Sequence, residues 1–200
     1  MADPATAHDS MSTAQLCAII ELACRAPSLH NSQPWRWTFD NGSLSLFADH
    51  GRVGTHTDST GREVILSCGA VLDHLQVAAA AAGWQVSVQR YPDPSDHDHL
   101  ALAEFHPTES VSEHARRLAE AISTRRTDRL AFAAPQPWDE LELQLPTLLR
   151  GTVTYLDIIG DDGRPTLADA SRQSEERRLD DASYRYELLW WTGRSDTDDA

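Results

Sequence analysis

The spacing of apolar residues near the start of the chain predicts an amphipathic helix. Between residues 13 and 25, apolar side chains recur every three or four positions, which places them on one helix face. Ser12 and Gln15 have the spacing of a capping box at its start. Pro27 ends the helix because a residue before proline, here Ala26, avoids helical geometry.

The pattern then changes to strict alternation. The segments "WRWTF" and "LSLFA" both alternate with period two, which is typical of half-buried strands. The residues between them, Asp40-Asn41-Gly42, are a strong signal for a tight hairpin turn. We therefore expect an antiparallel pair of strands directly after the first helix.

The rest of the chain mixes helices with further strands. A long apolar helix is expected from about Arg62 to Ala82, and the polar residues within it make it a core helix rather than a membrane span. The other expected elements are the strands "WQVSVQRY", "LALAEF" and "TVTYLDII", a helix near 111–123 with Ser110 and Glu113 as its capping box, a short helix near 138–145 that Pro146 interrupts, and a last long helix from Arg164 towards Trp191. Helices interspersed with hairpin-linked strands favour an α+β fold over a strict βαβ alternation.

Composition excludes several classes of function but does not assign one. The 200 residues carry a formal net charge of −14, which argues against a nucleic-acid partner and against an anionic membrane surface. The polar N-terminus lacks the features of a signal peptide, and the three cysteines lack disulfide or zinc spacing, so a cytoplasmic protein without a metal is expected. His97 and His99 belong to a polar loop without the spacing of an established zinc motif.

The first candidate site is the loop "RAPSLHNSQPWRW", residues 25–37. Ser28, Asn31 and Gln33 offer several donors and acceptors, as a planar heterocycle with alternating carbonyls and ring nitrogens requires. Pro34 fixes the direction in which the chain leaves the loop. The alternative is ordinary turn chemistry, because Ser and Asn are common at helix exits.

The second candidate is "RRTDR", residues 125–129. Three arginines and a threonine within five residues could hold a phosphate through guanidinium forks and a hydroxyl. The alternative is a solvated helix end, where the helix dipole favours arginine. We find neither a P-loop nor a nucleophile elbow, so hydrolytic and nucleotide-triphosphate functions have no motif to support them.

Four segments together resemble a known family. "ACRAPSLHNSQPWRW", "GREVILSCGAVLDH", "RRTDRLAF" and "YELLWWTG" look like the FMN-binding nitroreductase superfamily, and in this order they are most similar to its Acg-type branch. In that branch two nitroreductase-like halves are fused in one chain. The resemblance extends from about Thr13 to Gly193.

The resemblance implies an FMN site made of both candidate segments. The family's loop lies against the isoalloxazine ring, which implies ring contacts for Pro27, Ser28, Asn31 and Gln33. The family's Arg-x-Ser/Thr-x-Arg/Lys element binds the phosphate, which implies phosphate contacts for Arg125, Thr127 and Arg129, with Arg126 nearby. No such element precedes the first helix, so one flavin site is expected rather than two. No catalytic side chain is implied.

The resemblance also implies a domain organisation. The expected parts are a disordered N-terminus (1–12), a first nitroreductase-like half (13–124), the start of a second half (125–193) and an acidic disordered tail (194–200). Acg-like chains continue well past "WWTG", so a three-layer nitroreductase-like fold with a central antiparallel or mixed sheet and an incomplete second half is expected. The apolar face at Leu188–Trp191 would then be open to a homodimer partner or another chain.

Two functions remain open at this point. The first is an FMN-dependent oxidoreductase that takes electrons from NAD(P)H and passes them to an acceptor, since the flavin carries that chemistry without a protein acid or base. The second is a non-catalytic protein that stores or sequesters FMN, to which the Acg-type branch bears more resemblance than the reductases do. A shortened chain that needs a partner is a further alternative.

Overall fold

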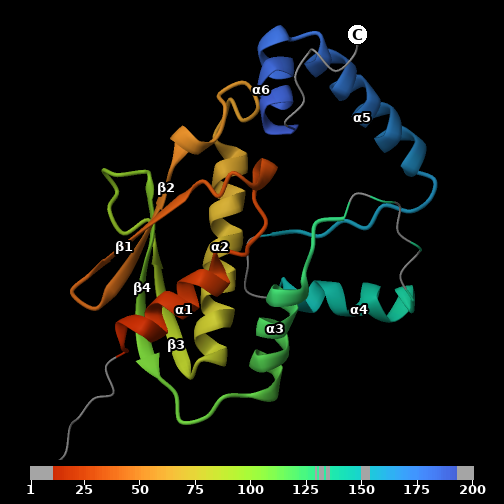
Figure 1. The fold of residues 1–200 in the computed structure, drawn as a ribbon. Coiled ribbons are helices and arrows are strands. Elements are labelled where there is room, and N and C mark those ends of the chain that lie inside the picture. The colour runs from red at the N-terminus through yellow and green to blue at the C-terminus, as the bar shows by residue number, and fades with distance from the viewer. Residues whose placement is uncertain (1–10, 129, 131–132, 134–135, 150–153, 193–200) are drawn as a thin grey trace, which may run out of the picture. The chain divides into compact units, whose positions relative to one another are not determined.

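The computed structural model describes residues 11–128, 130, 133, 136–149 and 154–192. The chain divides into two compact units, residues 1–127 with 187–200 (unit 1) and residues 128–186 (unit 2). Its elements are α1 (Thr13–Ala23), the 3-10 helix η1 (Leu29–Asn31), β1 (Trp35–Asp40), β2 (Ser43–Ala48), the 3-10 helix η2 (His50–Arg52), α2 (Arg62–Ala81), β3 (Trp84–Arg90), β4 (His99–Pro107), α3 (Glu113–Thr124), α4 (Trp138–Leu148), α5 (Arg164–Leu179) and α6 (Ala182–Thr192) (Figure 1).

The predicted hairpin is confirmed. β1 and β2 pair antiparallel, with Asp40 opposite Ser43, so two residues form the turn. Asn41 and Gly42 have φ values of 48° and 82°. A two-residue turn needs positive φ at both positions to match the twist of the strands, and Asn-Gly is the pair that accepts this most readily.

The hairpin belongs to a four-stranded sheet in the order β1-β2-β4-β3, in which every described pairing is antiparallel. Helix α2 packs against this sheet, and α1 and α3 pack against α2 (Figure 1). This arrangement confirms the α+β class with a central antiparallel sheet.

Helix α2 forms the centre of the core. It meets the length and apolarity of a membrane-spanning helix, but its side chains Val64, Val71 and Leu75 are almost fully buried among those of the sheet and α1. The prediction of a core helix is therefore confirmed. Leu44 and Leu46 of β2 project into the same core, alternating with the half-buried outward residues of that strand.

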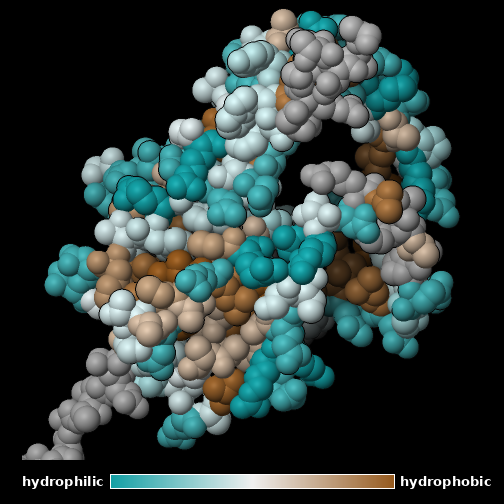
Figure 2. All heavy atoms as spheres, viewed as in Figure 1, coloured by the Kyte–Doolittle hydropathy of each residue, from teal (hydrophilic) through white to brown (hydrophobic). Residues whose placement is uncertain are grey.

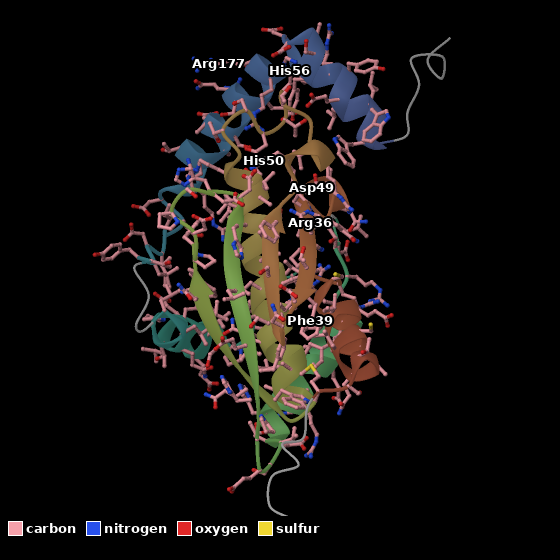
Figure 3. All side chains as sticks on the ribbon, turned by 90° about the vertical axis from the view of Figure 1, so that its left-hand side faces the viewer. Arg36, Phe39, Asp49, His50, His56 and Arg177 are labelled. Atoms are coloured by element: carbon pink, nitrogen blue, oxygen red, sulfur yellow. The ribbon has the colours of Figure 1, made fainter. Side chains whose placement is uncertain are left out.

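The hydropathy of the surface of unit 1 differs between helices α1 and α3. Apolar residues gather over α1 on the face shown in Figure 2, whereas α3 presents mostly hydrophilic residues there. On the sheet face away from α2, the guanidinium of Arg36 lies 4.4 Å from the centre of the Phe47 ring, which stacks in turn on His99. Figure 3 looks onto the sheet and shows Arg36 and Phe39 along β1.

The predicted start of the α3 helix is wrong by two residues. Ser112, not Ser110, is the N-cap, and its hydroxyl accepts a hydrogen bond from the amide of Ala115 at 3.1 Å. Only Ser110 has a glutamate three positions later, so the capping-box spacing favoured the wrong serine. Because Ala115 and Ile122 are the buried residues of α3, the helix register is set by packing against α2.

Two predictions for unit 2 are also wrong. The segment "TVTYLDII" is no strand over its described residues 154–159, and the described part of unit 2 offers no neighbouring strand with which it could pair. The last predicted helix is two helices, α5 and α6. The carboxylate of Asp181 accepts from the amides of Ser183 and Tyr184, so it caps a new helix instead of continuing the old one.

Helix α4 is longer than predicted, because it runs through Pro146 to Leu148. Of the terminal segments expected to be disordered (1–12 and 194–200), residues 1–10 and 194–200 lie outside the described residues, whereas Ser12 is ordered as the N-cap of α1. The division of the chain into two nitroreductase-like halves stays a prediction.

Candidate functional site

The loop after α1 has an unusual backbone. His30, Asn31 and Gln33 all have positive φ values, of 50°, 57° and 50°. Non-glycine residues rarely adopt this left-handed conformation, and it persists only where the surroundings hold it. Three such residues within four positions mark the loop as more than a connector between α1 and β1.

Hydrogen bonds hold this loop in place. The Ser28 hydroxyl accepts from the amide of Gln33 at 3.0 Å, so it closes the loop on itself. The Ser67 hydroxyl, in α2, accepts from the amide of Leu29 at 3.2 Å and donates to the carbonyl of Glu63 at 2.7 Å. Ser67 is 5% exposed, so the loop is tied directly to the core helix.

The exit of the loop is also buried. Pro34 and Trp35 lie in the core, and the Cys68 thiol donates to the Pro34 carbonyl at 3.2 Å. Burial raises the pKa of the Cys68 thiol to about 12, so it remains protonated and keeps this hydrogen bond. Trp35, the first residue of β1, thereby anchors the strand in the core.

Polar side chains of the loop are left available for a ligand. The side-chain amides of Asn31 and Gln33 make no hydrogen bond with another residue in the described ranges, and Asn31 is exposed. The Ser32 hydroxyl is buried and has no hydrogen-bond partner among these residues. A buried hydroxyl without a partner is costly unless a ligand or water supplies one.

The arginine segment lies next to this loop. The Arg25 guanidinium donates to the Ser123 carbonyl at 2.9 Å, and the Arg125 guanidinium donates to the Arg25 carbonyl at 3.4 Å. These bonds join Arg25, the first residue of the loop segment, to the C-terminal end of α3. The tertiary structure therefore brings Arg25 and Arg125, a hundred positions apart in the chain, together within unit 1.

The predicted phosphate residues are only partly described. Arg125 donates to the Thr127 hydroxyl at 3.3 Å, which pairs two of them. Arg126 donates to the carbonyls of Ser123 and Arg125 at 3.0 and 2.8 Å. Arg129 lies outside the described residues.

A histidine lies beside this cluster. His74 of α2 shares an open groove with Arg125, Leu118 and Ile122, and its Nδ1 atom is buried without a partner in the described part of the chain. Burial is the largest cause that lowers the pKa of His74, and the positive charge of Arg125 lowers it further, while Asp73 and the Ala23 backbone oppose the shift. His74 is thus held in its neutral form.

The last residues of α6, from Glu187 on, belong to unit 1 and contact the rest of that unit at two points. The Glu187 carboxylate accepts from the Thr57 hydroxyl at 2.6 Å and from the amides of Thr57 and His56 at 2.8 and 3.2 Å. Burial raises the pKa of Glu187, but these hydrogen bonds outweigh burial and the pKa is lower than usual. The Trp191 ring stacks on His30, with centroids 5.7 Å apart, so an indole lies against the loop.

Three residues of this neighbourhood were not predicted from the sequence. Ser67 lies at a buried position of an apolar helix, and a lone serine there is a signal that could have been used. Arg25 is the first residue of the loop segment, but the sequence assigned it no contact. Ser32 is a loop serine like many others, and only the fold shows that its hydroxyl is buried.

Comparisons with known proteins identify the family to which the chain is similar. Over 190 residues the chain is 51% identical to "Putative NAD(P)H nitroreductase acg" of Mycobacterium tuberculosis, a match that covers 94% of this chain and 57% of that protein. A second protein of the same organism that is named an NAD(P)H nitroreductase is 40% identical over 178 residues, or 88% of this chain and 50% of that one. The chain belongs to the nitroreductase superfamily, in its Acg-type branch.

The chain spans only about half the length of the curated relatives it matches. No family model matches it. Among solved structures, a nitroreductase family protein from Streptococcus pneumoniae has a TM-score of 0.40 and 16% identity, over 66% of this chain and 88% of that one. The family assignment therefore rests on the sequence relatives.

Proposed function

We propose that this chain contributes an FMN site to an NAD(P)H-dependent oxidoreductase of the nitroreductase type. The observation that carries the proposal is the meeting of the strained loop with the arginine segment through Arg25, Ser123 and Arg125. One segment offers amide and hydroxyl groups for a heterocyclic ring, and the other offers guanidinium groups for a phosphate.

The residues present fit such a cofactor. Asn31 and Gln33 carry side-chain amides without a described partner, and the buried Ser32 hydroxyl lacks one. On the phosphate side, Arg125 and Thr127 already form a pair that could grip an oxyanion, with Arg126 beside them and Arg129 following in sequence. The bound flavin would accept hydride from NAD(P)H and pass electrons to an acceptor.

The chain's own part in this chemistry is positioning. Ser67 and Ser28 hold the loop backbone, so the side chains of Asn31 and Gln33 have fixed origins. The neutral His74 and the protonated Cys68 add no charge near the loop or the arginines. We assign no general acid or base. The use of NAD(P)H makes the cytoplasm the expected compartment.

Storage of FMN is the second candidate function. It is supported by the stacking of Trp191 on His30, because an aromatic cover against the loop would hinder access to a bound ring.

Trp190, next to Trp191, is 68% exposed. We propose Leu188–Trp191 as the surface through which a second copy or another chain would contact this one; a stable lone monomer in gel filtration would contradict this.

The proposal is tested by purifying the chain and measuring bound flavin by its visible absorbance. NAD(P)H is then added without oxygen. Rapid bleaching is the result expected of a reductase, and a persistent yellow colour is the result expected of storage. A protein that neither copurifies with FMN nor binds added FMN would refute both functions for this chain.

Replacing Arg125 and Arg129 together with alanine tests the assignment of the phosphate segment. We expect the double variant to lose FMN, because it removes two charge-assisted contacts of about 1.5–3 kcal/mol each. Circular dichroism must show that the variant remains folded. An unchanged flavin content in the folded variant would show that this segment does not hold the phosphate.

A further inference from the structure

Three guanidinium groups converge at the C-terminal end of α3. Nη2 of Arg25 and Nη1 of Arg126 both donate to the carbonyl oxygen of Ser123, at 2.9 and 3.0 Å. The two nitrogens therefore lie within about 6 Å of each other, a distance at which like charges repel appreciably near a protein surface. Arg125 joins them through its bond to the Arg25 carbonyl.

No carboxylate neutralises this cluster in the part of the chain that the structure describes. The ion pairs found there use other arginines, namely Arg52, Arg116, Arg164 and Arg172. Asp73 lines the same groove as Arg125 but forms no ion pair with it. In a chain with 31 acidic residues, three adjacent arginines without an acidic partner are an unbalanced arrangement. The carbonyl ends of α3 offset only part of the charge.

The arginines also keep donors for a ligand. Each guanidinium has five N–H donors. The hydrogen bonds described for Arg25 use only Nη2, and those for Arg126 use only Nη1. Guanidinium groups with remaining N–H donors match the geometry of phosphate oxygens, which accept two parallel bonds.

We infer that Arg25 is a further ligand of the phosphate, and that the site takes a terminal phosphomonoester dianion held by Arg25, Arg125 and Arg126. The identity of the ligand rests on the proposed function, whereas the anion preference rests on the cluster itself. Arg25 lies two residues before Pro27, so the same chain segment would contact the phosphate end and the ring end of one ligand.

A purely structural role for Arg25, as a cap for the Ser123 carbonyl, makes a different prediction. Arg25→Gln keeps an N–H donor for that carbonyl but removes the charge, whereas Arg25→Lys keeps the charge but loses the fork. Arg117→Gln is the matched control, because Arg117 is an exposed arginine of α3, the helix that supplies the Ser123 carbonyl, and the change in net charge is identical.

Dissociation constants for FMN and for riboflavin, which lacks the phosphate, separate the two roles. We expect Arg25→Gln to weaken FMN binding by about 10- to 100-fold, the effect of losing a charged hydrogen bond. Riboflavin binding should not change. Arg25→Lys should fall between Arg25→Gln and the parent chain, and Arg117→Gln should bind FMN like the parent chain.

The other outcomes are equally decisive. If Arg25→Gln weakens FMN and riboflavin equally, Arg25 only shapes the loop and the inference is wrong. If it changes neither constant, the inference is wrong while the proposed function stands. If the parent chain binds no flavin, inorganic phosphate is titrated by calorimetry. Binding that Arg25→Gln abolishes would support the anion site and refute the proposed function, and absent binding would refute both.

Discussion

Ser67→Ala is the substitution that most directly links the core to the candidate loop. The Ser67 hydroxyl makes two hydrogen bonds, one with the Leu29 amide and one with the Glu63 carbonyl of its own helix. Alanine removes both. The Leu29 amide then loses its described partner at the first residue of η1, so the start of the strained segment loses its tie to α2.

The expected size of the effect follows from these two bonds. An unpaired, partly buried amide costs about 1–3 kcal/mol. The better helix propensity of alanine offsets roughly 0.5 kcal/mol, and the Glu63 carbonyl retains its helical hydrogen bond. The net loss in the free energy of unfolding should be about 1–2 kcal/mol, or a melting temperature roughly 2–8 °C lower for a chain of this size.

Amide hydrogen exchange is the most informative assay, because it reports the loop itself. The Leu29 amide should exchange about 5- to 30-fold faster in Ser67→Ala, which is the factor that corresponds to 1–2 kcal/mol. Ser123→Ala is the matched control. The Ser123 hydroxyl also donates to a carbonyl four residues earlier in its helix, but it is exposed and accepts no loop amide in the described structure.

Two results would refute this reasoning. One is a Ser67→Ala variant as stable as Ser123→Ala, with unchanged exchange at Leu29. The other is a general loss of protection across α2 without a specific effect on the loop, which would show that Ser67 stabilises the helix rather than the loop. If flavin binds as proposed, Ser67→Ala should also weaken FMN binding, through the loop rather than through a contact between Ser67 and the flavin.

Three further predictions concern single titratable groups. The pKa of Glu187 lies below its ordinary value of 4.5, so the Glu187 carboxylate stabilises the fold at pH values above 4.5. This stabilisation is lost as the pH falls through the lower pKa of the folded state. The melting temperatures of Glu187→Gln and of the parent chain should therefore converge in acid. The pKa of His74 lies below 6.5, so protonation favours the unfolded chain; as the pH falls below 6.5, the parent chain should lose stability relative to His74→Gln. Cys68, with its pKa raised to about 12, should resist a thiol reagent that modifies the exposed Cys17 in the native protein, and should react once the protein is unfolded. Mass spectrometry of the labelled native and unfolded protein measures this. Equal labelling of Cys68 in the two states would contradict the prediction.

The sequence was sufficient to predict those elements whose conformation depends on residues close together in the chain. The Asn41-Gly42 turn, the Ser12 cap and the long apolar helix α2 were all predictable, because each depends on neighbours in the chain. The strand predicted at 152–159 is absent over its described residues 154–159, because a sequence pattern predicts only which side chains share a face, whereas a strand also needs a neighbouring strand to pair with.

The candidate site shows the same division. By itself, the sequence supplied the two segments and the residue types that a flavin ring and a phosphate require. It could not show that Arg25 and Arg126 share the Ser123 carbonyl, that Ser67 holds the loop, or that the Ser32 hydroxyl is buried without a partner. These contacts join the loop after α1 to α2 and to the end of α3, across dozens of residues. Only the packing of the helices on one another decides them, because burial and charge proximity are properties of space rather than of order along the chain.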